Sequence, residues 1–168
     1  MTNMKKEILA IIADFINLHP TTIKNYLPFI KDSVLMIFKK DMNPLIKEES
    51  LKVLNQIIRI YSREILDSTI NCHDLTQLLL NEIKFLRPTA SVAGRIWSLL
   101  GNLSEKFEEK MKTFQVEIQE VMFDTLKTQM ADLDKPQIKT IVGCLQGFNS
   151  CLGYNKLKDP SLQELFIL

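Results

Sequence analysis

TLKTQMADLDKPQIKTIVGCLQGFNSCLG, residues 125–153, is the stretch that decides the fold. Its apolar positions stop at a polar corner and resume after Pro136, and the fixed φ of proline suits the first turn of a helix. The apolar residues beyond the corner recur at helical spacing: Ile138, Ile141, Val142, Leu145 and Phe148. The stretch therefore predicts two helices joined by a short corner, a unit that needs neighbours to bury its apolar faces.

Similar units recur along the chain, because prolines stand at four predicted corners: Pro44, Pro88, Pro136 and Pro160. The helices that open the units should begin near residues 4, 44, 90 and 136, at intervals of about 40–46 residues, which is the period of HEAT-type helix pairs. We therefore predict an all-α fold, an α-solenoid of HEAT-like antiparallel helix pairs with about three and a half repeats and no sheet. The chain should form a single solenoid segment over 1–168, part of a longer solenoid, with pairs at about 3–40, 44–86, 89–131 and 136–168.

Helix ends and buried faces can also be predicted. Asn43 is the expected N-cap of the helix that starts at Pro44. Residues 62–71 form a polar connection, and single helices are expected over 72–85 and 111–131. Ala93 and Gly94 should let a partner helix approach closely. The first helix is expected to bury Ile8, Ile12, Phe15 and Ile16, and the third Leu51, Leu54, Ile57 and Ile58.

Composition indicates a globular protein, with 46% apolar and 24% charged residues among 168. The net charge is only +1, although residues 1–63 carry +4 and the remainder −3. No apolar run approaches the roughly 20 residues that cross a bilayer, so no membrane partner is expected. Three cysteines without a CxxC spacing are typical of a reducing compartment, the cytosol or nucleus.

Catalytic motifs are absent from the sequence. Neither His19 nor His73 has a second metal ligand three or four residues away, which argues against zinc. Cys144 and Cys151 lie seven apart on one predicted helix face, where core packing is a better interpretation than nucleophilic chemistry. There is no GxGxxG, P-loop, HRD or DFG sequence. We expect no enzyme activity, cofactor, metal or small-molecule substrate for this chain.

One group of basic residues is a candidate for binding a phosphate backbone. Solenoid corners align along one edge, so cations there could follow a nucleic-acid strand in a sequence-independent, salt-sensitive way. Acidic residues lie among them (Asp41, Glu48 and Glu49), and no aromatic is placed to stack on a base, so a solvated charged edge is the alternative. The candidate DNA-backbone contacts are Lys39, Lys40, Lys47, Lys52 and Arg59.

The stretch GRIWSLLGNLSEKF (94–107), followed by LKTQM (126–130) and GCLQGFNSCLG (143–153), resembles the N-terminal helical-repeat arm of the DNA-dependent protein kinase catalytic subunit. That arm likewise has a Leu-Leu-Gly helix, a long helix ending in Leu-Lys-Thr-Gln-Met, a proline-containing corner and a Gly-Cys-Leu-x-Gly helix. A weaker similarity extends upstream through EILAIIADF (7–15), IKNYL (23–27) and FKKD (38–41), so the resemblance covers most of the chain.

The resemblance implies a role in DNA repair. The family, one of the phosphatidylinositol 3-kinase-related kinases, is a giant nuclear serine/threonine kinase that the Ku heterodimer recruits to broken DNA ends in non-homologous end joining. Its N-terminal solenoid cradles DNA and Ku, and its kinase domain lies far downstream. By resemblance this chain would be a nuclear, non-catalytic scaffold for DNA-end and Ku docking (cytosolic if it is an isolated fragment), with Lys39, Lys40 and Lys47 where the family carries lysines near the DNA. Glu48, Glu49 and the near-neutral charge depart from that pattern. The alternative is a generic HEAT-repeat scaffold that binds proteins and not DNA.

Overall fold

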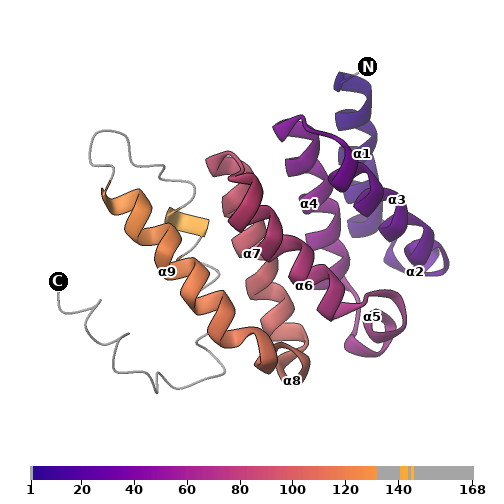
Figure 1. The fold of residues 1–168 in the computed structure, drawn as a ribbon. Helices are drawn as coiled ribbons and strands as arrows, with labels where there is room; N and C mark the ends of the chain where they lie inside the picture. Colours follow the sequence, from indigo (N-terminus) through magenta and orange to yellow (C-terminus); the bar gives the residue numbers. More distant parts are fainter. Residues whose placement is uncertain (1, 132–140, 144, 146–168) are drawn as a thin grey trace.

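Stacked helices make up the computed structural model, which describes residues 2–131, 141–143 and 145 (Figure 1). The first row contains α1 (Thr2–Leu18), α4 (Pro44–Ile60) and α7 (Ala90–Lys106), and α4 packs against both of its neighbours. Each of these helices is followed by a return helix: α3 (Leu27–Lys40), α6 (Cys72–Asn81) and α9 (Gln115–Ala131). No strand occurs within the described residues, and the predicted all-α, solenoid-like fold is confirmed.

Short helical turns connect the long helices. They are α2 (Pro20–Ile23), the 3-10 turn η1 (Lys24–Tyr26), α5 (Arg63–Thr69), the π-helical turn η2 (Glu82–Leu86), α8 (Glu108–Met111) and the 3-10 turn η3 (Lys112–Phe114). The predicted fourth helix pair, at 136–168, falls almost wholly outside the described residues; 141–143 and 145 are helical.

The corner before α4 forms as the sequence predicts. Asn43 has an extended backbone, and its side-chain Oδ1 accepts a hydrogen bond of 2.9 Å from the backbone N–H of Leu45. Pro44 occupies the first helical turn, where its missing N–H costs no helical hydrogen bond. A capping oxygen and a proline thus start α4 at the expected residue.

One expectation about the elements is wrong, and two predicted helices differ from the structure in local geometry. The supposed polar connection at 62–71 contains α5, because Leu66 and Ile70 are fully or almost fully buried and anchor a helical turn there. The expected helix 72–85 leaves α-geometry at Glu82 and ends in the π-helical turn η2. The expected helix 111–131 is preceded by α8 and becomes regular only at Gln115, after the 3-10 turn η3.

Burial along α4 agrees with the prediction, whereas burial along α1 does not. Leu51, Leu54, Ile57 and Ile58 are all fully buried between the two rows. In α1, Ile8 and Phe15 are exposed, Ile12 is half-buried, and Ile16 is buried together with Leu9. The reason is position: α1 ends the row, so only the side that faces α4 and the return helix has a described neighbour.

A close backbone contact joins α7 to the helical residues 141–143. A Cβ atom added to Gly143 would lie 2.3 Å from the Cα of Gly94, far inside van der Waals contact. A side chain at position 143 would therefore clash with the backbone of α7, and glycine there allows the two helices to approach this closely. The prediction that Gly94 permits a close helix contact is confirmed.

Candidate nucleic-acid interface

The α3–α4 corner places the first two candidate lysines at the protein surface. Lys39 and Lys40 lie in the last turn of α3; both are exposed, and neither makes an ion pair with a described residue. Cations at a helix C-terminus also interact favourably with the helix dipole. These two side chains are therefore available to bind an anion.

Asp41, which follows them, is neutralised within the protein. Its carboxylate accepts a hydrogen bond of 2.8 Å from Lys5 of α1 and one of 3.0 Å from the backbone N–H of Asn43. The hydrogen bond from Lys5, reinforced by the one from Asn43, lowers the pKa of Asp41 below its ordinary value. The acid beside the lysine pair thus contributes to the corner's structure and is already balanced by a cation.

Lys47 has a different environment from the one expected. It is only 5% exposed, and its Nζ lies 2.5 Å from Oε1 of Glu82, which is also buried. The same ammonium group stands 4.8 Å from the centre of the Phe38 ring. Lys47 therefore joins α3, α4 and η2 inside the protein and is enclosed away from the surface on which Lys39 and Lys40 lie.

The two remaining candidates, on the body of α4, are not grouped with the lysine pair. Lys52 is half-buried and bonds Glu49 at 2.7 Å, a pair three residues apart on one helix. Arg59 is exposed and makes no ion pair with a described residue, but it lies in the last turn of α4, at the opposite end from the α3–α4 corner. The structure thus separates the five predicted residues into an exposed pair, a buried lysine, a paired lysine and a distant arginine.

Glu48 also has its partners within the protein. It accepts a hydrogen bond of 2.6 Å from the hydroxyl of Ser91, and its other oxygen lies 3.5 Å from Nε of Arg95. Partial burial alone would raise the pKa of Glu48, but the hydrogen bond from Ser91 and the charge of Arg95 outweigh it and hold the pKa below its ordinary value. The two acids that lie among the lysines in the sequence therefore have partners of their own. Glu48 connects α4 to α7, and Glu49 bonds Lys52 within α4.

Two further exposed cations were missed by the sequence analysis. Lys6 lies near the start of α1, and Arg87 directly follows η2 at the next corner. Arg87 has φ 43°, a left-handed conformation that a non-glycine residue adopts at some cost, and Pro88 follows it. The Arg-Pro corner was visible in the sequence, but the left-handed conformation of Arg87 was not.

A groove of about 380 Å³ lies beside the exposed lysines. It is lined by Lys5, Met36, Ile37, Lys40, Asp41 and Met42, from α1 and the end of α3. The groove thus combines two lysines and apolar side chains with one carboxylate, Asp41, which Lys5 already bonds.

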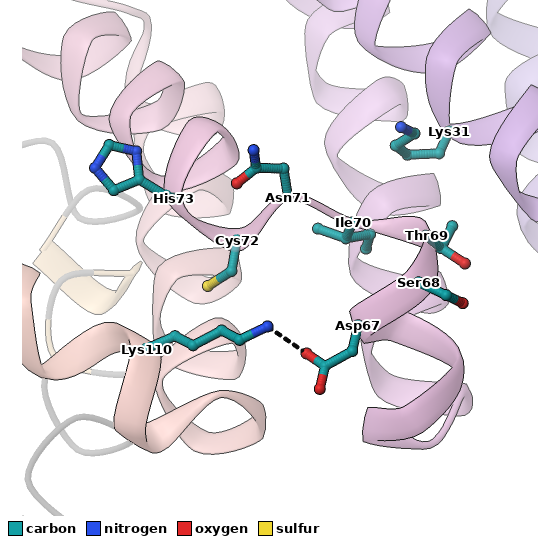
Figure 2. A pocket seen from close by; sticks show the side chains of 9 residues that line it. All are labelled: Lys31, Asp67, Ser68, Thr69, Ile70, Asn71, Cys72, His73 and Lys110. Carbon is teal, nitrogen blue, oxygen red and sulfur yellow. Dashed lines mark hydrogen bonds and ion pairs between the residues drawn. The ribbon is translucent and has the colours of Figure 1, made fainter.

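A second groove, of about 680 Å³, lies where α5 meets α6 (Figure 2). Lys110 crosses it to bond Asp67 at 2.7 Å, and Cys72 and His73 are at the start of α6. The Cys72 thiol donates to the sulfur of Met111, and burial raises its pKa above the ordinary value, the opposite of what a reactive thiolate needs. His73 packs on Phe114 with ring centres 4.9 Å apart.

Metal and membrane sites can be assessed for the described part of the chain. No group of three or more His, Cys, Asp or Glu residues there is arranged to hold a metal ion. None of the described helices has the length and apolar character required to cross a bilayer.

The protein-family model described as "DNA-PKcs, N-terminal" matches residues 1–162. The chain belongs to this family. It is also 27% identical over 154 residues to the DNA-dependent protein kinase catalytic subunit of Dictyostelium discoideum; the alignment covers 89% of this chain and 4% of that protein. No solved structure matches the chain. The matched family model describes the N-terminal region of DNA-PKcs, which lies outside the kinase domain. This DNA-PKcs N-terminal segment is therefore non-catalytic, as the sequence predicts.

Proposed function

We propose that this segment is part of a solenoid scaffold on which broken DNA ends and the Ku heterodimer dock during non-homologous end joining in the nucleus. The observation that carries the proposal is the family match over residues 1–162, together with the name of the Dictyostelium discoideum relative. The chain spans 4% of that relative's length, so DNA-end and Ku docking by this segment is a proposal, and no catalytic activity is proposed for it.

Duplex DNA would contact the exposed cations at the corners. Lys39 and Lys40 are solvent-accessible, and the acid beside them, Asp41, is already bound by Lys5. Lys47 is enclosed and Lys52 is bonded to Glu49, so the candidate contact surface comprises Lys39 and Lys40. Lys6 of α1 and Arg87 after η2 are further exposed cations. Lysines placed in this way bind phosphate oxygens without reading the sequence.

The test is duplex binding by fluorescence anisotropy at several salt concentrations. Lys39→Glu/Lys40→Glu should weaken binding for every sequence, and it should reduce the slope of log K against log[salt] by about 0.9 for each lysine that contacts a phosphate. Lys24→Glu/Lys127→Glu, which makes the same charge change at exposed positions of η1 and α9, is the matched control. Equal affinities and slopes for the two double variants would remove the lysine pair from the DNA surface.

A protein-binding scaffold without DNA affinity is the second candidate. The observation that favours it is the exposed apolar corner at the end of η2, where Phe85 is 75% and Leu86 56% exposed. Exposed apolar groups gain more from a protein partner than from a phosphate backbone. Absence of duplex binding even at low salt, for wild-type protein of verified fold, would favour this candidate over the DNA scaffold.

A further inference from the structure

One face of α1 carries an uninterrupted apolar stripe. Its residues are between 49% and 68% exposed and succeed one another at intervals of four, three, four and three positions. This spacing keeps them on one face of the helix over about 21 Å, which is the pattern of a helix face that packs on other helices. The α1 stripe consists of Met4, Ile8, Ile11, Phe15 and Leu18.

The same positions are buried in the next two helices of the row. The helices start at Thr2, Pro44 and Ala90, so α4 and α7 are offset from α1 by 42 and 88 residues. The first four stripe positions therefore have four counterparts in each of the other two helices, and all of these counterparts are at most 1% exposed. They are Ile46, Ser50, Val53 and Ile57 of α4, and Val92, Ile96, Leu99 and Leu103 of α7.

Successive helices of the row meet through unlike sides. Glu48 and Asn55 of α4 contact Arg95 and Asn102 of α7, at 3.5 and 2.6 Å. At the two offsets, the α4 residues are equivalent to positions 6 and 13 of α1, whereas the α7 residues are equivalent to positions 7 and 14. Each helix thus contacts the helix after it through one side and the helix before it through another.

The acids Glu7 and Asp14 mark an exposed side of α1. They occupy the positions through which Arg95 and Asn102 of α7 contact the preceding helix, and the α1 stripe adjoins them. Both acids are exposed, and neither makes an ion pair with a described residue. By equivalence with α7, this side of α1 is the one that receives a preceding helix of the row.

We propose that the α1 stripe receives a further helix pair, which precedes this segment in the same polypeptide and extends the row by one unit. The contact continues the row, because it joins the same two unlike sides as the α4–α7 contact does. It also removes the stripe from water, as stacking does for each unit of a solenoid. A longer polypeptide agrees with the Dictyostelium discoideum relative, of which the aligned segment makes up 4%. This inference is independent of DNA and Ku docking.

The charges beside the stripe specify the chemistry of the incoming helix. Glu7 and Asp14 are seven residues apart, about 10 Å along the helix. In the α4–α7 contact an acid, Glu48, lies opposite the cation Arg95, and at α1 the sign of the charge is reversed. The incoming helix therefore carries Lys or Arg at two positions seven residues apart, beside an apolar face. An acid in the place of Glu48 would face Glu7, and like charges at such a contact are destabilising.

The first test compares hydrogen exchange of α1 in the 168-residue chain and in the longer polypeptide. The amides of α1 should exchange about tenfold more slowly in the longer polypeptide, at every protein concentration, because a covering helix pair suppresses local opening. Ile11→Glu should remove this protection. Val116→Glu, which introduces the same charge at an exposed apolar position of α9, should retain it. Circular dichroism of both variants should show an unchanged helical content.

The second test adds a helix pair of known sequence. Residues 44–89 of this chain are placed ahead of residue 2, so that the added copy of α4 precedes α1 by the same interval as α4 precedes α7. In the added copy, Glu48→Lys/Asn55→Lys supplies two cations, and Asn55→Glu alone gives two acids as the matched control. The copy with two lysines should slow α1 exchange about tenfold more than the copy with two acids at low salt, and high salt should reduce the difference.

Three results would overturn the proposal. Equal α1 exchange in the 168-residue chain and in the longer polypeptide would show that no preceding helix pair covers the stripe. Protection that develops in the 168-residue chain as its concentration rises would assign the stripe to a second copy. Equal protection by the copy with two lysines and the copy with two acids would show that Glu7 and Asp14 do not select the incoming helix.

Discussion

Trp97 is the bulkiest side chain that α7 buries completely, and it is the single tryptophan of the chain. Its indole N–H has no hydrogen-bond partner among the described residues. A buried donor without an acceptor costs about 1–3 kcal/mol relative to hydration, whereas the ring itself contributes through packing. The unpaired indole N–H therefore destabilises the folded protein, whereas packing of the Trp97 ring stabilises it.

Substitutions at Trp97 should separate these two effects. Trp97→Phe retains an aromatic ring and removes the unpaired donor, so the free energy of unfolding should stay within about 1 kcal/mol of wild type. Trp97→Ala leaves a cavity and should cost about 3–5 kcal/mol. Urea unfolding followed by circular dichroism measures both. Equal losses for Phe and Ala would contradict an unsatisfied indole N–H.

At the scale of elements, the Lys47–Glu82 ion pair joins the first turn of α4 to η2, at the end of the same helix pair. Both side chains are less than a tenth exposed, and the ammonium also faces the Phe38 ring. Breaking a buried pair leaves one charge in the interior without compensation, and this costs more than the intact pair contributes. The position of η2 against α4 should depend on keeping both charges or neither.

This dependence predicts a non-additive result in a double-mutant cycle. Glu82→Gln alone should lower the free energy of unfolding by about 3–5 kcal/mol, because Lys47 stays buried and charged. Lys47→Met/Glu82→Leu should recover most of that loss, because apolar side chains of similar volume replace both charges. Glu117→Gln, which breaks the more exposed Lys84–Glu117 pair, should cost less than about 1 kcal/mol. Additive losses in the double variant would show that each residue acts through separate contacts.

The sequence predicted elements well where local chemistry decides them, and poorly where stacking does. Asn43 and Pro44 start α4 through a cap that their own chemistry specifies. Exposure of Phe15 could not be predicted, because its spacing is that of a core residue and only the end position of α1 leaves it uncovered. Burial of Lys47 required knowing that Glu82, 35 residues away, lies opposite. The exposed lysine pair was predicted correctly as a surface corner, but a DNA contact there stays a prediction.

For the molecule as a whole, the carboxylates that join its helices should make the free energy of unfolding fall as the pH is lowered. The pKa values of Glu48 and Asp41 are lowered in the folded protein, by contacts with α7 and with α1 respectively. The unfolded chain therefore binds more protons than the folded chain as the pH falls, so acid favours unfolding. The stabilisation is complete above the ordinary pKa values of 4.5 and 3.8, and it is lost as the pH falls through the lower folded values.

Urea unfolding between pH 7 and pH 3 should show this loss directly. The free energy of unfolding should be flat near neutral pH and should decline below about pH 4.5, the ordinary value for Glu48. Glu48→Gln should lower stability by about 1 kcal/mol at pH 7 and make the acid decline shallower, because the Ser91 and Arg95 contacts lose a charged partner. Glu120→Gln changes an exposed carboxylate of α9 and should leave the decline as it is in the wild type. Identical pH profiles for Glu48→Gln and wild type would mean that the α4–α7 contact does not depend on that charge, and that the acid sensitivity arises elsewhere in the row.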